Sequence, residues 1–194
     1  MTRAGVLALQ GDVREHVAAL EAAGADTVAE IRRPEQLDRL AALVLPGGES
    51  TTVSRLMVEY GLADAIRQRV DAGMAVLGTC AGLILLAEAV DDFRLPVLGL
   101  LPLRVRRNAY GRQVDSFEAR LEAPALGPEP LPAVFIRAPR IVEAGEGVDI
   151  LARHRGDPVL CRRGRVVGAS FHPELTADRR VHRLLLQAAV GMDG

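Results

Sequence analysis

The chain has 194 residues, of which 49% are hydrophobic, and a formal net charge of −1, so we expect residues 1–194 to form a single domain with a substantial core. The near-zero charge gives no reason to expect nucleic acid or a membrane surface as a partner, and no run approaches the ~20 apolar residues of a membrane span. All 24 basic residues are arginine, so no lysine is available for Schiff-base chemistry.

Strand and helix patterns alternate in the first half of the chain. Short apolar runs predict strands, and apolar residues at helical spacing predict helices. In chain order we expect a strand at 4–9, a helix at 13–23, a strand at 27–31, a short helix opened by Pro34, a strand at 42–45, helices at 52–60 and 63–72, a strand at 74–77 and a helix at 81–89. This order predicts an α/β fold with three layers, an open and mostly parallel sheet with helices on both faces.

The second half is richer in strand patterns. Short runs at 103–107, 113–121, 133–136, 148–154, 159–162 and 166–171 are separated by Gly, Pro or charged turns. Residues 178–190 predict a closing helix whose buried stripe is Val181, Leu184, Leu185 and Ala188. The proline-rich stretch 123–132 is interpreted as a surface excursion.

One cysteine lies between a predicted strand and a predicted helix, in the run Gly78-Thr79-Cys80-Ala81-Gly82. The glycines permit a sharp turn, and a helix N-terminus stabilises a thiolate. Gly-x-Cys-x-Gly in this place is the sulfur counterpart of a nucleophile elbow. We therefore predict that Cys80 is a nucleophile, which then needs a base, a group that orients the base and an oxyanion hole.

His172 is the candidate base among four histidines, because it ends an apolar run and is followed two residues later by Glu174. On an extended segment these two side chains project to the same side, so Glu174 can orient the imidazole. The alternative is a structural or surface histidine. We place His16 and His182 on solvated helix faces and His154 in a surface turn.

A second strand-to-helix transition carries Gly47 and Gly48. Paired glycines let backbone N–H groups approach a ligand, which suits an oxyanion hole and a substrate cradle. A tight strand–helix turn uses Gly-Gly equally well, so both interpretations stay open. Ser50 or Thr51 is expected to cap the following helix.

The two cysteines occupy unlike places in the sequence, which argues against a disulfide framework. Cys161 has no elbow around it and is interpreted as an ordinary strand thiol. We therefore expect a reducing compartment and a cytoplasmic location.

Six stretches, spread over nearly the whole chain, resemble one family: 5–11, 46–52, 78–82, 107–113, 135–139 and 170–176. The elbow and His-Pro-Glu motifs are similar to those of class I, triad-type glutamine amidotransferases in general. The Arg-Asn…Gly-Arg-Gln and Phe-Ile-Arg-Ala-Pro motifs resemble more specifically the glutaminase subunits of pyridoxal 5′-phosphate synthases. No motif position departs from this pattern.

The resemblance implies that Cys80, His172 and Glu174 form a triad that hydrolyses L-glutamine to L-glutamate and ammonia through a γ-glutamyl thioester. It implies glutamine binding by Gly47, Gly48, Glu49, Arg107, Ile136 and Arg137, and oxyanion donors at Gly48, Ala81 and Gln10. It also implies a pyridoxal phosphate synthase subunit as partner, whose docking rearranges Gln10-Gly11. No metal and no cofactor are expected in this chain.

Other interpretations remain open at this point. Arg107 could be one of several solvent-exposed strand arginines. Gln10-Gly11 is also suited to a simple turn at the end of a strand. The chain could serve a different synthase, act alone as a cysteine peptidase or hydrolase, or be a non-catalytic regulatory subunit.

Overall fold

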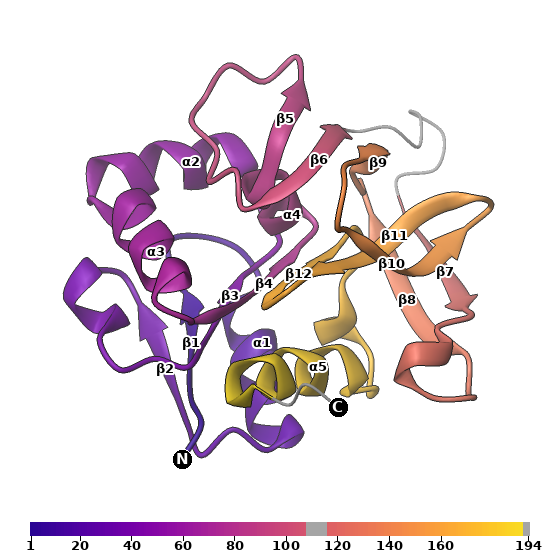
Figure 1. The fold of residues 1–194 in the computed structure, drawn as a ribbon, viewed down its shortest axis with the longest axis horizontal. Helices are drawn as coiled ribbons and strands as arrows, with labels where there is room; N and C mark the ends of the chain where they lie inside the picture. Colours follow the sequence, from indigo (N-terminus) through magenta and orange to yellow (C-terminus); the bar gives the residue numbers. More distant parts are fainter. Residues whose placement is uncertain (108–115, 192–194) are drawn as a thin grey trace.

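The computed structural model describes residues 1–107 and 116–191, which contain a central seven-stranded sheet in the order β10-β11-β12-β4-β3-β1-β2 (Figure 1). Its strands are β1 (Arg3–Leu7), β2 (Thr27–Ile31), β3 (Ala42–Leu45), β4 (Ala75–Thr79), β10 (Asp149–His154), β11 (Asp157–Arg163) and β12 (Val166–Ala169). From β2 to β12 all neighbours pair in parallel, and β11 and β10 add an antiparallel edge. The prediction of a mostly parallel sheet is confirmed.

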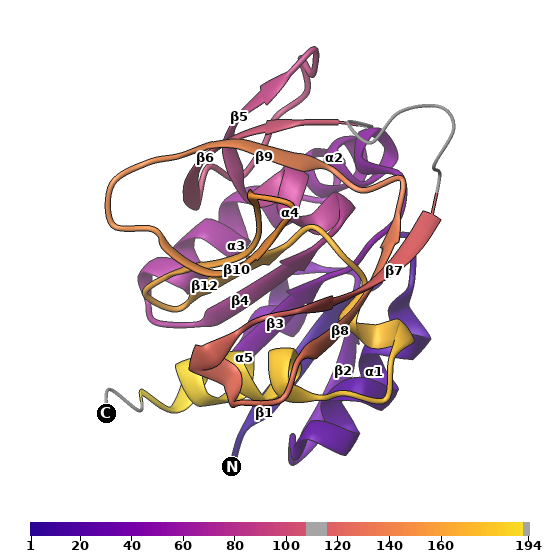
Figure 2. The same ribbon diagram turned by 90° about the vertical axis from the view of Figure 1, so that its right-hand side faces the viewer.

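Helices cover both faces of this sheet (Figure 2). One face carries α2 (Ser50–Glu59), α3 (Leu62–Asp71) and α4 (Ala81–Leu86), and the other carries α1 (Val13–Ala23) and α5 (Arg180–Val190). Strand β3 shows why the core divides in two. Its residues Leu43 and Leu45 belong to the core under the first group of helices, whereas Ala42 and Val44 belong to the core under the second. Alternate side chains of a strand face opposite ways, so a strand covered on both faces is apolar throughout.

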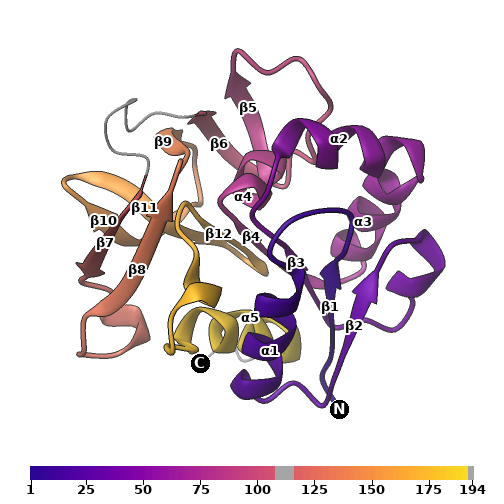
Figure 3. The ribbon, with the colours of Figure 1, turned by 180° about the vertical axis from the view of Figure 1, so that it is seen from behind.

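Two smaller sheets flank the central one in the described part of the chain. Strands β5 (Ala87–Asp91), β6 (Leu101–Arg106) and β9 (Arg140–Ala144) form one, and the antiparallel pair β7 (Ser116–Leu121) and β8 (Leu131–Ile136) forms the other. Seen from behind in Figure 3, β5 and β6 lie above α4, and the β7–β8 pair lies to the left of the central sheet. Short 3₁₀ turns at η1 (Pro34–Leu37), η2 (Pro124–Leu126) and η3 (Pro173–Leu175) each begin at a proline.

The helix predicted over 81–89 is wrong in its second half. Helix α4 ends at Leu86, and Ala87 begins strand β5, which pairs in parallel with β6. Alanine and glutamate favour a helix by themselves, but pairing between distant segments overrides that local preference. The sequence also gave no indication of β9, where only Ile141 is buried, so no alternation was visible.

The remaining predicted elements are confirmed with small shifts at their ends. The strands expected at 4–9 and 166–171 end earlier, at Leu7 and Ala169. The strand expected at 113–121 is described from Ser116, and its first three residues lie outside the described part. The surface excursion predicted at 123–132 is only partly correct, because Ala123 and Leu131 are buried in the core and strand β8 begins at Leu131. Within the described ranges, no helix is both long and apolar enough to cross a bilayer.

Candidate active site

Cys80 occupies the tight turn between β4 and α4. Its backbone has φ of 48° and ψ of −104°, a conformation that non-glycine residues seldom adopt, and its N–H donates a 2.9 Å hydrogen bond to the Ala169 carbonyl. A Cβ on Gly82 would overlap the Leu45 carbonyl oxygen, and one on Gly78 would press on the Gly82 backbone. Both glycines of the motif are therefore needed for this turn, and the predicted sharp turn between strand and helix is present.

His172 reaches the elbow from the segment after β12. Its Nδ1 lies 2.7 Å from Glu174 Oε1 and 3.3 Å from Asp12 Oδ2, and its backbone N–H donates to the Val134 carbonyl at 2.8 Å. A Cβ on Gly47 would meet the imidazole ring, so that glycine makes room for it. The predicted pairing with Glu174 is present, but the 3₁₀ turn η3 produces it rather than an extended strand.

The surroundings of His172 favour its protonated form. Burial lowers the pKa of His172, but hydrogen bonds with Asp12, Cys80 and Glu174 outweigh burial and raise it to about 12. Burial raises the pKa of Glu174, an effect that the interaction with His172 opposes. The protonated ring is a hydrogen-bond donor beside the Cys80 sulfur. Sequence analysis missed Asp12, which follows the resemblance stretch 5–11 directly.

Two histidines predicted on solvated faces are instead fully buried behind His172 and Glu174. His16 Nδ1 lies 3.0 Å from His182 Nε2, while His16 Nε2 lies 3.1 Å from Thr79 Oγ1 and 3.3 Å from Glu174 Oε2. Burial lowers the pKa of both, well below the usual range for His16 and to about 4 for His182. The prediction failed because α1 and α5 pack against each other over the sheet. Each helix therefore buries a histidine that the helical pattern alone predicts on the solvent-exposed face.

A cavity of about 390 Å³ opens over the thiol. Its lining is Gln10, Gly11, Asp12, Gly48, Glu49, Ser50, Cys80, Ala81, Ile84, Arg107, Ile136, Arg137 and His172. The cavity therefore gathers the predicted site residues from distant parts of the chain. Of the others, Gly47 lies behind the His172 ring and Glu174 is buried beneath it.

The loop from Gly48 to Glu49 forms one wall of the cavity. Gly48 has φ of 147°, which favours glycine, and the Glu49 N–H donates a 2.6 Å hydrogen bond to Gln10 Oε1. The Glu49 carboxylate accepts from the backbone N–H groups of Thr51 and Thr52 at 3.0 and 2.7 Å. Glu49 therefore caps α2, and the prediction of Ser50 or Thr51 as the cap is wrong. Slight burial raises the pKa of Glu49, but these hydrogen bonds prevail and lower it to about 2.

Arg107 also lines the cavity. Its Nη2 lies 3.5 Å from Glu49 Oε1, and its guanidinium lies 5.0 Å from the centre of the Phe93 ring. Arg107 is therefore part of the cavity wall rather than a solvated strand residue. Phe93 lies in a segment that carried no resemblance, so the sequence did not indicate it. The rest of the predicted Arg107 motif, residues 108–113, lies outside the described residues.

Ile136 and Arg137 form the third wall. The Ile136 carbonyl accepts a 3.7 Å hydrogen bond from Cys80 Sγ, and Arg137 has φ of 42°, in the left-handed region. Ala81 is the first residue of α4, so its N–H has no partner within the helix. The predicted oxyanion donors Ala81, Gly48 and Gln10 all line the same cavity.

Cys161 and His154 lie outside this cavity. Cys161 is buried in β11 against the Gly168 carbonyl, and burial raises its pKa to about 12. Its place within β11 agrees with the ordinary strand thiol that was predicted. Neither cysteine is in a disulfide. His154 ends β10 and stacks 5.2 Å from the Phe117 ring, so it lies at a strand end rather than in a turn.

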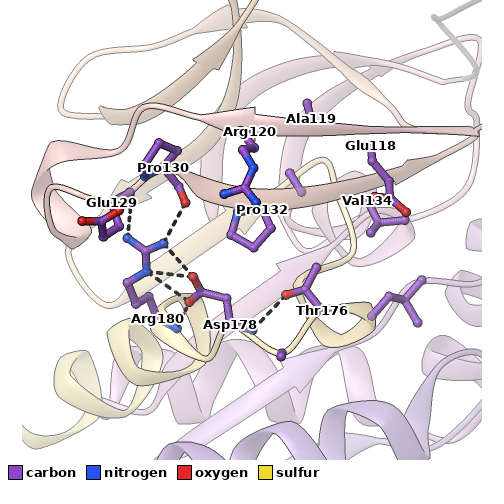
Figure 4. A pocket seen from close by; sticks show the side chains of 13 residues that line it. Glu118, Ala119, Arg120, Glu129, Pro130, Pro132, Val134, Thr176, Asp178 and Arg180 are labelled. Atoms are coloured by element: carbon purple, nitrogen blue, oxygen red, sulfur yellow. Dashed lines mark hydrogen bonds and ion pairs between the residues drawn. The ribbon is translucent and has the colours of Figure 1, made fainter.

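Two other features have some of the properties of a site. Ligand atoms of Asp12, His172 and Glu174 lie within 4.8 Å of one another, but the hydrogen bonds to the imidazole account for that closeness. A larger cavity of about 710 Å³ lies between the β7–β8 hairpin and the segment before α5 (Figure 4). In this cavity the Arg180 guanidinium already donates hydrogen bonds to the Asp178 carboxylate and to the Glu129 and Pro130 carbonyls. The residues that line the cavity include no cysteine or histidine.

Comparisons with known proteins agree with this geometry. A model of the SNO glutamine amidotransferase family matches residues 6–191. The chain is 51% identical over 183 residues to the pyridoxal 5′-phosphate synthase subunit PdxT of Thermotoga neapolitana, covering 94% of this chain and 97% of that one. It is 53% identical over 188 residues to the PdxT of Pelotomaculum thermopropionicum, covering 97% and 95%. A crystal structure of a glutamine amidotransferase, 51% identical, superposes with a TM-score of 0.91 over 96% of this chain and 98% of the other.

Proposed function

The chain belongs to the SNO glutamine amidotransferase family, and we propose that Cys80, His172 and Glu174 are the triad with which it hydrolyses L-glutamine to L-glutamate and ammonia. One observation supports this most strongly. An elbow thiol and a carboxylate-bound imidazolium face the same cavity, and that cavity also holds a paired acid and arginine. A non-catalytic subunit has no need of this combination.

Acylation starts from the thiolate of Cys80, which attacks the side-chain carbonyl carbon of glutamine. Backbone N–H groups of Ala81 and the Gly47-Gly48 loop hold the tetrahedral oxyanion, and one such donor is worth about 3–4 kcal/mol. The His172 imidazolium gives its proton to the departing ammonia as the γ-glutamyl thioester forms.

Deacylation uses the same imidazole as a base. The acylated sulfur no longer carries the charge that helps to raise the pKa of His172, so the ring is now able to take a proton from water. The hydroxide attacks the thioester carbon, the C–S bond breaks and the Cys80 thiolate leaves. The proton taken from water stays on His172, so the thiolate–imidazolium pair is restored, and the γ-carboxyl group of the product loses its own proton to solvent as glutamate departs. Glu174 holds Nδ1 throughout, which leaves Nε2 for the reaction.

Glutamine binding is assigned to the outer part of the cavity. The substrate carries an ammonium and a carboxylate on its α-carbon. Arg107 suits the carboxylate and Glu49 suits the ammonium, because these two side chains already pair at 3.5 Å and offer complementary charges. Backbone groups of Ile136 and Arg137 complete the pocket on the other side.

The ammonia goes to a pyridoxal phosphate synthase subunit that forms a complex with this chain. Ammonia released to water at neutral pH is mostly ammonium, which is not a nucleophile, so transfer within a complex preserves its reactivity. Relatives at 51% and 53% identity are named as subunits of that synthase, which favours this partner over a different synthase. We propose that docking rearranges Gln10-Gly11 and completes the oxyanion hole.

We also propose that the chain acts as one domain in the cytoplasm. Its two hydrophobic cores share the central sheet, and its two cysteines are free. A single cooperative unfolding transition and recovery in the cytoplasmic fraction of lysed cells are the expected results.

The test of the function is glutamate formation from glutamine with and without added synthase subunit. We expect strong stimulation by that subunit. High activity that the subunit does not change would favour a separate hydrolase, and activity on peptides but not on glutamine would favour a cysteine peptidase.

A further inference from the structure

A chain of buried polar side chains continues inward from the triad, and the mechanism above does not use it. We propose that His16 is a positioning residue. Its Nε2–H holds Oε2 of the Glu174 carboxylate, so that the other oxygen, Oε1, stays on His172. The inference rests on the proposed role of Glu174 and extends it to a residue one layer deeper.

The geometry places His16 where such a contact is needed. Glu174 Oε1 is bound to His172 at 2.7 Å, while Oε2 is buried and has no hydrogen-bond partner in residues 1–107 and 116–191. His16 Nε2 lies 3.3 Å from this Oε2 and 3.1 Å from Thr79 Oγ1. Both side chains of the His16–Glu174 pair are fully buried, so water does not replace the contact.

Only one tautomer of His16 suits all its neighbours. With the proton on Nε2, the ring donates toward Glu174 Oε2 and Thr79 Oγ1, and Nδ1 is free to accept from His182 Nε2 at 3.0 Å. With the proton on Nδ1, a ring lone pair would face the carboxylate oxygen, and His182 Nδ1–H would be a buried donor without an acceptor. In the first arrangement His182 Nδ1 is an unpaired acceptor, and it has no hydrogen-bond partner among the described residues.

The charged groups around this chain agree with neutral rings. Burial is the largest cause that lowers the pKa of both His16 and His182. Positive charge on His182 and His172 also opposes a proton on His16, and Arg179 opposes one on His182, while the acid that faces His16 is Glu174 at 3.3 Å. Asp12 faces Glu174 and disfavours its ionised form. A neutral donor on Oε2 therefore counteracts both burial and Asp12 without competing with His172 for charge.

This contact has two consequences for the reaction. It fixes the rotation of the carboxylate, so that the imidazole keeps Nε2 toward the thiol. It also keeps Glu174 ionised, because a hydrogen bond donated to a carboxylate stabilises the charged form. Loss of the donor should raise the pKa of Glu174 further and move the acidic limb of the pH–rate profile to higher pH.

The variants His16→Leu and His16→Gln separate this role from packing. His16→Leu fills similar space without a donor, and we expect kcat to fall roughly 10- to 100-fold with KM little changed, by analogy with hydrogen-bond partners that orient metal-ligating histidines. His16→Gln restores a donor near the Nε2 position and should recover most of the activity and the wild-type acidic limb. His154→Gln, at a histidine outside the cavity, is the matched control and should match the wild type.

A measurement on the unaltered protein tests the inference even if a variant fails to fold. NMR of ¹⁵N-histidine-labelled protein distinguishes the two tautomers, and we expect His16 as the Nε2–H form over the neutral pH range. An Nδ1–H tautomer, or a folded His16→Leu variant with wild-type kcat and pH profile, would overturn the proposal. Absence of glutaminase activity in the wild-type complex would instead contradict the proposed function, and the tautomer result would still stand by itself.

Discussion

The Gln10 side-chain carbonyl accepts a 2.6 Å hydrogen bond from the Glu49 backbone N–H. This bond joins the loop after β1 to the loop before α2, and a Cβ on Gly48 would collide with the same Gln10 oxygen. The two loops that carry the proposed oxyanion donors are therefore tied together by one side chain.

Replacing Gln10 should weaken the response to the synthase partner. We expect Gln10→Ala to lower partner-stimulated glutamate formation roughly 2- to 10-fold, because one hydrogen bond is worth about 0.5–1.5 kcal/mol. Gln36→Ala is the control, since Gln36 also binds backbone N–H groups but lies in the remote turn η1. Equal stimulation of Gln10→Ala and wild type would remove Gln10 from the site.

Asp12 should raise the pKa of the His172 imidazole. Asp12→Asn removes a negative charge 3.3 Å from His172 Nδ1, so the pKa of His172 should fall and the imidazolium should be less available at neutral pH. We expect kcat to fall roughly 2- to 10-fold in a steady-state assay. Glu15→Gln alters an exposed charge in the same helix and should have no effect. An unchanged rate in Asp12→Asn would show that Glu174 alone sets the base.

His172 should make stability depend on pH in one direction. A group whose pKa is raised on folding, here from 6.5 to about 12, stabilises the fold fully below 6.5, and this contribution is lost as pH rises toward 12. The difference in unfolding free energy between wild type and His172→Gln should therefore shrink as pH rises from about 6 to about 10. Denaturant titrations at several pH values measure it. A difference that grows with pH would contradict the imidazolium assignment.

Glu49 should affect both helix α2 and substrate binding. Glu49→Ala removes the cap on Thr51 and Thr52 and the partner of Arg107, so we expect a loss of about 1 kcal/mol in stability together with a higher KM for glutamine. Chemical denaturation and initial rates measure the two effects. The control is Glu59→Ala, at the exposed far end of the same helix. A normal KM in a destabilised Glu49→Ala would limit Glu49 to a capping role.

Local patterns predicted the architecture well because most elements have one apolar face and clear ends. Helix Val13–Ala23 and strand Thr27–Ile31 have the predicted bounds. The elbow at Cys80 was visible because strand, glycines and helix are contiguous in sequence. Strand β5 was not visible in the sequence. Its partner β6 begins ten residues after β5 ends, and no local pattern specifies their pairing.

The parts of the site that escaped prediction are held by contacts across the fold. His16 and Glu174 are 158 positions apart in the chain, yet they meet because α1 packs beside η3. Asp12 and Phe93 enter the site only through the loops that bring them to His172 and Arg107. Residue type and helical spacing indicated none of these contacts. For His16 they predicted the solvated face of the helix, whereas the side chain lies on the buried face.

The most direct test of the account is to identify the thiol that carries the reaction. The wild-type complex is treated with a glutamine analogue bearing an electrophile in place of the amide, and the modified residue is mapped by mass spectrometry. We predict one adduct, on Cys80, that excess glutamine suppresses, with Cys161 unmodified and with Cys80→Ala neither labelled nor active. Labelling of Cys161, or glutamate formation that persists in Cys80→Ala, would contradict the central claim.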